Sequence, residues 1–557
     1  MWSIVLPDNT ALDGVPDLNF ELNSPIFSTS DATVLPGSFT FPFDVPLTPR
    51  NRVALGHPNL VNNAAAWRTY PGTWVLLYGA PVFYGTLTIR TCTPTKVSLT
   101  VVANPVERLR ETLLTELDLG GDRAMPANLL THMDTVASTP SAYDYAFFPV
   151  AAPDGAVQNK FSTTTGLAVS DTYATTPFVK LIYLLNAAFT QAATGFHFVN
   201  SFQLPAIKEL NWLYLYNNKD LRVSDGATAP VLPTTFNLQQ HVPRIKVPEM
   251  LKNVCGLFNL GLFANVFERT LVLEPIESIL SRSPRLDWTN YQAGEMAIDS
   301  SIPPPNYYNY GAPGGTPPPD FPEMENAPRY RNEGELDAAF ASGTPPGYGS
   351  YEDVFVRRDA LPGGGYVGVF GTRRSYGVKV GTGTQVPYDN NCAVQPCAGL
   401  YTTEAVSKYE GLPADTPTQW TYKAQDFGFS LMLYRGRQSF TFAGNRPWAS
   451  SNVWQPIALD RYDLVENGVT LGKAEYALHW DGEYGLFNRW HRRWQNMLAT
   501  GKPVVQQFIV PLQALLNFSF RDKIVVGSME YVPTKLRVQK AVGQGKVLIE
   551  LNLISVI

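Results

Sequence analysis

The chain alternates apolar and polar residues, as β-strands do, near both of its ends, and it shows helical periodicity mainly in between. Near the N-terminus, residues 74–78 and 82–89 flank Gly79-Ala80-Pro81, which is the pattern of a hairpin. Residues 38–43 and 96–102 alternate in the same way. Because 557 residues exceed what one core usually serves, we expect three or four domains. The predicted fold class is α+β, β-rich and multidomain.

Two interior segments place apolar residues along one face of a helix, at steps of four, three and four. They are Phe178, Ile182, Leu185 and Phe189 in the first segment, and Val247, Leu251, Val254 and Phe258 in the second. Thr176-Pro177 precedes the first, as an N-cap followed by proline at the first helical position. Each helix can bury its apolar face against the strands expected after it, so 176–282 is predicted to be a helix-on-sheet domain with two similar units. A short helix is expected at about 106–117, and a turn at 262–264.

Residues 428–557 are predicted to be mostly β, with one helix at about 486–500. The apolar stripe of this helix is Phe487, Trp490, Trp494 and Met497, opposite Arg489, Arg492 and Arg493. We interpret the stripe as a core face and not as a ligand site. A hairpin is expected from 428–434 and 438–442, followed by strands at 504–510, 518–526, 534–539 and 546–554.

The charge balance argues against a nucleic-acid ligand. The chain has 43 Lys and Arg against 48 Asp and Glu, a net charge of −5, so no basic field would hold phosphates. Charged residues make up 16% and aromatic residues 12%, which suits surfaces buried against other subunits. The N-terminus has no signal-peptide pattern, and no segment reaches the about 18 apolar residues of a membrane span. We expect the protein to be made and folded in the cytoplasm.

The motifs of catalysis and cofactor binding are weak or missing. Gly363, Gly365 and Gly368 satisfy G-x-G-x-x-G, but the residues after them alternate like a strand where a helix is needed. The six histidines show no metal-binding spacing. Asp481 and Glu483 resemble a carboxylate pair, yet they precede a helix, where acids act as caps. We predict that the protein is not an enzyme and binds no cofactor or metal.

Four cysteines are too few for a disulfide framework in a chain of this length. Cys92 and Cys255 lie in apolar patterns and are expected to be buried as small hydrophobic residues. Cys392 and Cys397 enclose four residues, and a local disulfide between them stays open.

Proline, glycine and tyrosine dominate residues 300–350, which predicts an extended segment with little secondary structure. Its tyrosines Tyr307, Tyr308 and Tyr310 could form a stacking surface for a sugar or a protein. Exposed tyrosines in a linker are an equally ordinary explanation, so a binding role is one of two interpretations.

Several short patterns together resemble a known family. They are Gly37-Ser38-Phe39-Thr40-Phe41-Pro42-Phe43, Pro46-Leu47-Thr48-Pro49-Arg50-Asn51-Arg52, Leu55-Gly56, the strand pair around Gly85, residues 247–274, Leu478-His479-Trp480-Asp481-Gly482, Gly485-Leu486-Phe487, Phe520, Ile524-Val525-Val526-Gly527 and Tyr531. The set is similar to the tail hub and tail-tip proteins (baseplate hubs) of long-tailed bacteriophages and prophages, especially those of Bacteroidetes hosts. The proline-rich stretch at 300–350 departs from that pattern.

The resemblance implies a trimeric hub whose subunits each carry two β-barrel domains like those of the tail-tube protein. Three subunits would then present six barrels to a sixfold tube. Such a hub would join the tail tube, or a distal tail protein, to the central spike or fibre at the tail tip of the virion. It would also line the channel through which the genome is ejected, where a net charge of −5 favours release of DNA.

The predicted domain layout has five parts. It comprises an N-terminal β-barrel-like domain (1–117), a loop-rich connection or insertion (118–175), the helix-on-sheet domain (176–282), a Pro/Gly/Tyr-rich extended segment (283–375) and a C-terminal β-rich domain (376–557). Two other functions remain as alternatives. The tyrosines and short strands suit a carbohydrate-binding tail fibre or adhesin, and scattered acids alone suggest a cell-wall hydrolase, which is the least favoured.

Overall fold

The structure of the chain is a computed structural model that describes it in ranges separated by gaps. The described residues are 2–24, 38–60, 69–103, 109, 111–139, 143–148, 150–151, 157–159, 162, 165, 175–191, 197–199, 210–217, 219, 221, 232–265, 270–298, 306–308, 328–331, 335–336, 338–339, 342, 348–351, 354–360, 366–371, 378–379, 386–388, 429, 431–440, 444–450, 462–466, 469–474, 486–543 and 545–556.

The N-terminal unit is a strand, a short helix and a three-stranded meander. Its elements are β4 (Phe43–Pro46), α1 (Pro49–Ala54), β5 (Thr69–Leu77), β6 (Ala80–Cys92) and β7 (Lys96–Ala103). β5, β6 and β7 pair in order, β4 pairs with β7, and β1 (Trp2–Val5) pairs with β5. The predicted hairpin is confirmed, and it turns at Tyr78 and Gly79, whose φ angles of 51° and 84° match a type I′ turn.

The C-terminal unit repeats this order of elements. They are β31 (Pro503–Pro511), α9 (Leu512–Leu516), β32 (Ile524–Val526), β33 (Met529–Gly543) and β34 (Lys546–Val556). β32, β33 and β34 pair in order, and β31 pairs with β34. Two strands from earlier in the chain extend this unit, because β18 (Leu286–Asp287) pairs with β32 and β19 (Gln292–Ile298) pairs with β31.

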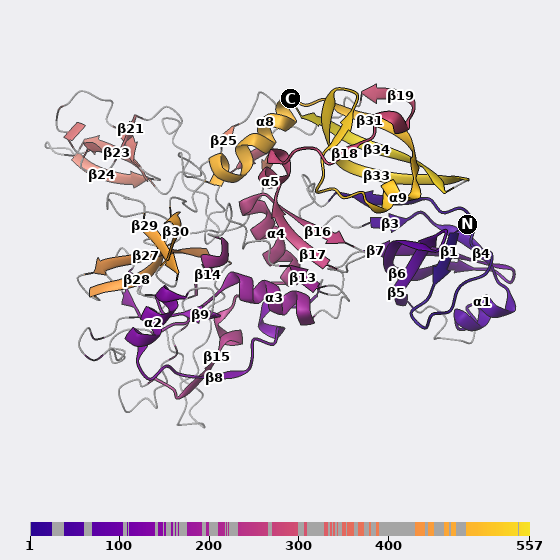
Figure 1. Ribbon diagram of the computed structural model, residues 1–557. Coiled ribbons are helices and arrows are strands. Elements are labelled where there is room, and N and C mark those ends of the chain that lie inside the picture. Colours follow the sequence, from indigo (N-terminus) through magenta and orange to yellow (C-terminus); the bar gives the residue numbers. More distant parts are fainter. Residues whose placement is uncertain are drawn as a thin grey trace.

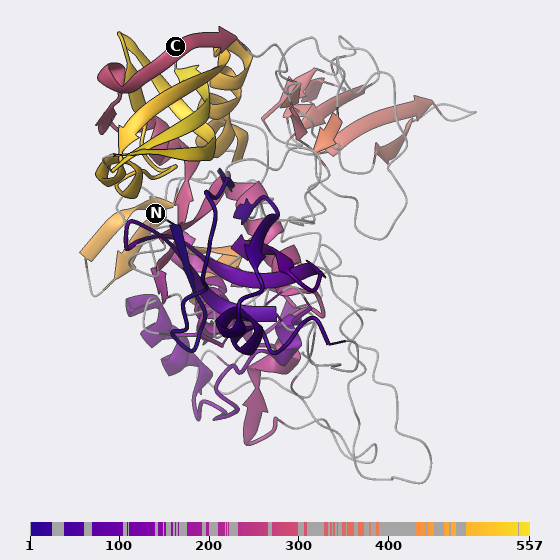
Figure 2. The same cartoon turned by 90° about the vertical axis from the view of Figure 1, so that its right-hand side faces the viewer.

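Two short strands join the units into one sheet of 13 strands, which we call the terminal sheet. β3 (Ser38–Thr40) pairs with β7 and with β2 (Phe20–Asn23), and β2 pairs with β33. The buried apolar residues of both units also form a single core. Figure 1 shows the indigo N-terminal strands beside the yellow C-terminal strands, and Figure 2 shows the same neighbours after a quarter turn. The two ends of the chain therefore fold together.

The described strands do not close into the barrels that the family resemblance implied, because the strand order of the terminal sheet runs openly from β1 to β19. In each unit a segment outside the named strands bridges the two edges that a barrel would join. In the N-terminal unit residues 11–14 run from the edge of β1 to the end of β4. In the C-terminal unit Trp288 and the short helix η8 (Thr289–Tyr291) connect β18 to β19. The ladder stops where these turns replace extended backbone.

Between 176 and 282 the chain forms a small sheet that carries two helices, as the fold class predicted. Its elements are α3 (Leu181–Gln191), β13 (His197–Val199), α4 (Val247–Phe258), β16 (Leu260–Asn265), β17 (Thr270–Pro275) and α5 (Ile276–Ser281). β17 pairs in parallel with β13 and antiparallel with β16, while α3 contacts β13 and α4 contacts β16. The two helix-and-strand units thus share one sheet, which we call the helix-on-sheet domain.

The remaining elements are shorter or lie farther along the chain. They are η3 (Leu114–Glu116), β8 (Asp122–Ala124), α2 (Leu129–Ser138), β9 (Tyr145–Ala146), β10 (Val150–Ala151), β11 (Val157–Gln158), β12 (Phe178–Val179), β14 (Leu213–Leu215), β15 (Thr235–Asn237), η7 (Leu238–His241), β20 (Asn306–Tyr308), β21 (Arg329–Tyr330), β22 (Tyr348–Tyr351), β23 (Val354–Ala360), β24 (Tyr366–Gly371), β25 (Val378–Lys379), β26 (Val386–Tyr388), β27 (Leu431–Phe440), β28 (Gly444–Ser450), β29 (Tyr462–Glu466), β30 (Val469–Ala474), the π-helical η11 (Phe487–His491) and α8 (Arg492–Thr500). β14 pairs with β27, so distant segments meet beside the helix-on-sheet domain (Figure 1).

Several local predictions were wrong. Of the helix expected at 106–117, the described residues contain η3, and the loop-rich 118–175 contains α2. α3 begins at Leu181 because Phe178 and Val179 pair with β9 as a strand. The turn expected at 262–264 is part of β16.

Two more corrections concern the C-terminal part. Residues 431–440 form one long strand, β27, which pairs with β28, so the hairpin expected within 428–442 is wrong. The strand expected at 518–526 is shortened to β32, because turns occupy the residues before it. The helix at about 486–500 is confirmed as η11 and α8, with Trp490, Trp494 and Met497 buried and Arg492 and Arg493 exposed.

Candidate functional site

The three predicted site residues are only partly described. Tyr307 and Tyr308 lie on β20, which pairs antiparallel with β25 and parallel with β26. Their side chains, and Tyr310 as a whole, lie outside the described part of the chain. A binding role for these tyrosines stays a prediction.

The other residues considered for chemistry are spread over the chain. Gly368 lies on β24, so the residues after the glycine pattern form the predicted strand. Cys92 and Cys255 are partly buried against the cores of the terminal sheet and the helix-on-sheet domain, respectively. Asp481, Glu483, Gly363, Gly365, Cys392 and Cys397 lie outside the described residues. Where side chains are described, no group of three or more His, Cys, Asp and Glu is placed to hold a metal ion.

Four residues recur at equivalent places in the two units of the terminal sheet. Phe43-Asp44-Val45-Pro46-Leu47 and Phe508-Ile509-Val510-Pro511-Leu512 share the pattern Phe-x-Val-Pro-Leu. In both copies the segment ends a strand and is followed by the short helix, α1 or α9. Phe43, Val45, Phe508 and Val510 are all buried in the shared core. The repeat therefore marks the same strand-to-helix corner twice.

The strands that pair with the two corners, β7 and β34, also match in residues and register. Val45 pairs with Val97 and Phe43 with Leu99, while Val510 pairs with Val547 and Phe508 with Ile549. Pro46 faces Lys96, and Pro511 faces Lys546. The backbone N–H after each proline donates to the turn before the paired strand, from Leu47 to the Thr95 oxygen and from Leu512 to the Gly545 oxygen, both at 2.7 Å. Residues, register and hydrogen bond thus agree between the two units.

Asn51 holds residues 11–14, the bridging segment of the N-terminal unit, through hydrogen bonds. This side chain is fully buried on α1; its Nδ2 donates to the Pro46 oxygen at 2.8 Å and to the Asp13 oxygen at 2.9 Å. Its Oδ1 accepts from the Asp13 N–H at 2.8 Å. A Cβ on Gly14 would lie 2.5 Å from the Pro46 ring, and Gly14 has φ of +65°, so this position requires glycine.

Trp288 fastens the corresponding bridge of the C-terminal unit. Trp288 is 2% exposed, and its ring lies 5.4 Å from the Phe508 ring, centroid to centroid. The backbone N–H of Trp288 donates to the Val525 oxygen at 2.9 Å. Beside it, Nε2 of the buried Gln506 donates to the Gly294 oxygen at 3.2 Å, where β19 has a bulge. The two bridges use different residues for the same purpose.

Apolar side chains are exposed around the terminal sheet. They are Val53 at 69%, Tyr78 at 44%, Val102 at 37%, Ile298 at 70%, Ile509 at 36%, Met529 at 40% and Val542 at 46%. Ile298 lies on β19, which pairs on one side only among the described strands. Exposed apolar residues on an edge strand are typical of a surface that meets another chain.

The terminal sheet meets the helix-on-sheet domain where α5 contacts α8. The apolar core of this joint contains Ile276, Ile279 and Leu280 of α5, Trp494, Met497 and Leu498 of α8, Phe263 of β16, and Val532 and Ile554 of the terminal sheet. Gly501 ends α8 so close to the sheet that an added Cβ would lie 2.6 Å from the Ser555 oxygen. α8 therefore continues rigidly into β31, whereas α5 continues β17 of the helix-on-sheet domain.

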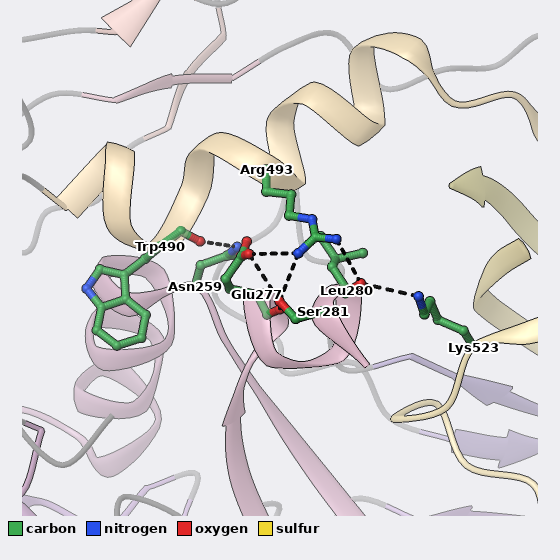
Figure 3. A network of polar contacts seen from close by, with 7 residues as sticks. All are labelled: Asn259, Glu277, Leu280, Ser281, Trp490, Arg493 and Lys523. Carbon is green, nitrogen blue, oxygen red and sulfur yellow. Dashed lines mark hydrogen bonds and ion pairs between the residues drawn. The ribbon is translucent and has the colours of Figure 1, made fainter. Parts of the chain in front are cut away.

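Polar contacts converge on the C-terminal end of α5 (Figure 3). Nη1 of Arg493 donates to Glu277 Oε1 at 3.2 Å and to Ser281 Oγ at 2.8 Å. Nη2 of Arg493 donates to the Leu280 oxygen at 3.2 Å, and Nζ of Lys523 reaches the same oxygen at 3.3 Å. Cations at the C-terminal end of a helix also interact favourably with its dipole.

A buried carboxylate lies at the start of the same joint. Glu274 of β17 is completely buried and accepts from Arg521 Nε at 2.6 Å, and it forms a second ion pair with Arg282. Arg521 comes from the segment before β32, so this pair also crosses from the helix-on-sheet domain to the terminal sheet. A buried charge needs such partners, because an unpaired carboxylate in the interior is strongly destabilising.

The end of α4 is capped by the π-helical turn. Asn259, in the left-handed conformation after α4, donates through Nδ2 to the Trp490 oxygen at 2.8 Å (Figure 3). Nε2 of His491 lies 3.0 Å from the Leu257 oxygen. Burial lowers the pKa of His491 to about 4, and hydrogen bonds to the Leu257 and Gly256 carbonyls oppose that shift.

Sequence reasoning missed this joint and the repeated corner. The corner had a signal, since Phe-x-Val-Pro-Leu occurs twice, 465 positions apart in the numbering of Phe43 and Phe508. For the joint, the arginines opposite the stripe of α8 were visible in the sequence, but their partners on α5 were not.

Comparisons with known proteins do not identify a family for this chain. No family model matches the chain, and no curated protein does. Among solved structures, the 43 kDa tail protein of prophage MuSo2 from Shewanella oneidensis aligns over 99% of this chain and 95% of its own, at 6% identity with a TM-score of 0.33. Identity and score at this level do not establish a common fold. In the part of the chain that the structure describes, no helix has the length and apolar character to cross a membrane.

Proposed function

We propose that the chain is a structural subunit of a bacteriophage-type tail, the hub at its tip, and that it acts as a homotrimer. The hub joins the tail tube or a distal tail protein to the central spike or fibre and surrounds the path of the ejected genome. It acts by assembly and not by catalysis.

The observation that carries this proposal is the repeated unit of the terminal sheet. A chain with two equivalent β-α-β-β-β units can match a ring of six with three copies, because each copy supplies two of the six positions. The sequence resemblance to tail hubs points to the same arrangement. The shared core and the strand β2 hold the two units at a fixed spacing, which a ring requires.

The sheet edges supply the contacts between copies in this proposal. β19 carries the exposed Ile298 at one end of the strand order, and β1, with Ala11 and Leu12 bonded along it, lies at the other end. In a ring, one end of each terminal sheet faces the opposite end of the next, as a heterologous interface that closes by rotation.

The first test is the mass of the purified protein by light scattering, followed by negative-stain class averages. A mass three times that of the chain, with a ring that shows six similar densities around a channel, is the expected result. A protein that stays monomeric both alone and with an isolated tail tube would contradict the hub. An elongated rod would favour the fibre, and binding to a glycan array would then be measured with Tyr307→Ala and Tyr308→Ala.

A further inference from the structure

The joint between α5 and α8 contains apolar contacts and charged hydrogen bonds, which have different effects on how the two domains are held. Its apolar core holds the terminal sheet against the helix-on-sheet domain, but apolar contact has no preferred direction. The guanidinium contacts of Arg493 and Arg521 are directional, because each needs its acceptor at a set distance and angle. Lys523, Asn259 and His491 add further hydrogen bonds across the joint, but the Arg493 and Arg521 contacts are the ones that pair charged side chains of the two domains.

The polar contacts are placed where sliding would break them. Arg493 belongs to α8 and Arg521 to the segment before β32, and both move with the terminal sheet. Their acceptors, Glu277 and Glu274, belong to α5 and β17 and move with the helix-on-sheet domain. The two contacts lie at different points of the joint, so together they allow one angle only.

We propose that the joint is an orientation lock, in which the apolar core keeps the two domains together and the Arg493 and Arg521 contacts select one angle between them. The lock belongs to the single chain and holds whether or not the protein is a tail hub. High salt should weaken the more exposed Arg493–Glu277 pair more than the Arg521 pair with the buried Glu274.

The test uses the double variant Arg493→Met and Arg521→Met in the full chain. Methionine keeps an apolar stem but removes the guanidinium. Both carboxylates retain a partner in the double variant, because Glu274 still pairs with Arg282 and Glu277 still accepts a hydrogen bond from the Ser281 hydroxyl. Arg492→Met is the matched control, since Arg492 is exposed on the same helix and forms no ion pair among the described residues.

The readout is the distance distribution between two spin labels attached through unnatural amino acids. One replaces Asn186, exposed on α3, and the other replaces Val542, exposed near the end of β33. The wild type and the Arg492→Met control should each give one narrow distance. The double variant should give a broad or split distribution and about tenfold faster amide exchange in α5.

A narrow, unshifted distribution in the double variant would overturn the orientation lock. If the double variant does not fold, Glu277→Gln in otherwise native protein weakens the Arg493 contact alone, and its distribution should broaden at 1 M salt more than that of the wild type. An equal response of the two proteins would also overturn the proposal. The result is independent of the mass measurement, so failure of the lock and failure of the hub are distinguishable.

Discussion

The N-terminal and C-terminal units of the terminal sheet have the same residues at equivalent core positions of the strand-to-helix corner but different residues on their outer surfaces. In both, Phe-x-Val-Pro-Leu ends a strand and pairs with a Lys-Val segment in the same register. The second position of this pattern points outward and differs. Asp44 forms an exposed ion pair with Lys96 at 2.6 Å, whereas Ile509 is an exposed apolar residue beside β19.

The difference shows which parts of a repeated unit are fixed by folding and which by neighbours. Core residues must fill the same space in both copies, so they are retained. Outward positions are not held by core packing, so they are free to differ between the two copies. In the proposed hub, the two units occupy equivalent places in a ring while their outer faces meet different partners.

The largest expected effect tests whether the two units really form one body. Phe83→Ala in the N-terminal unit and Trp288→Ala in the C-terminal unit should each lower the free energy of unfolding by about 3–5 kcal/mol, because both side chains are buried in the shared core. Amide exchange of β6 and of β34 should accelerate together in either variant. If each substitution affected only its own unit, the two units would unfold independently, and the shared core would not couple their stabilities.

Between pH 7 and pH 5, acid should destabilise the rest of the chain more than the two units of the terminal sheet. The described histidines that are fully buried, His241 and His491, lie outside the terminal sheet, and burial lowers their pKa to about 3 and about 4, respectively. The folded state therefore binds fewer protons than the unfolded state. This stability is complete above the unfolded pKa near 6.5 and is lost as the pH falls toward 4.

At pH 5 the lowered pKa of each histidine should reduce the free energy of unfolding by about 2 kcal/mol relative to neutral pH. Amide exchange of α4 should then accelerate between pH 7 and pH 5, after correction for the intrinsic rate, while β6 and β34 keep equal protection. His241→Gln should reduce the pH dependence. Loss of protection in one unit of the terminal sheet before α4 would contradict this assignment.

The bridging segments should respond differently to loss of a single side chain. Asn51→Ala should lower the free energy of unfolding by about 2 kcal/mol, because three hydrogen bonds of the buried Asn51 side chain to the backbone of Asp13 and Pro46 are lost. The C-terminal unit has Ala514 in its short helix and depends on Trp288 instead, so Ala514→Gly should cost about 1 kcal/mol through backbone freedom alone. Denaturant titration of both variants measures this contrast, and equal costs would mean that Asn51 does not hold the bridge.

The sequence predicted local elements better than their partners. α4 and the β5–β6 hairpin follow from spacing and turn residues, because their determinants are adjacent in the chain. The helix expected to start at Phe178 was wrong because pairing with β9 overrode the helical spacing at Phe178 and Val179. The joint could not be predicted, since Arg493 lies 216 positions from Glu277 and nothing local selects that partner.

The overall order of the sheet was also beyond local reasoning. β2 joins β33 across more than 500 residues of chain, and β18 and β19 join the C-terminal unit from within a segment that was expected to be extended. Such pairings are decided by which edges remain open after the hairpins have formed. The repeated Phe-x-Val-Pro-Leu pattern was the one long-range signal that the sequence did contain.

The smallest expected effect compares the two turns that receive the corner hydrogen bonds. Gly545 has φ of +72° and no atom within 4 Å of an added Cβ, so Gly545→Ala should cost about 1 kcal/mol through backbone strain alone. The equivalent Thr95 accepts the same bond from Leu47 without a positive φ, so Thr95→Ala is the matched control and should change stability by less than about 0.5 kcal/mol. Both are measured by denaturant titration. Equal effects at the two positions would show that the hydrogen bond tolerates either backbone conformation, and that the glycine is a difference between the units without energetic consequence.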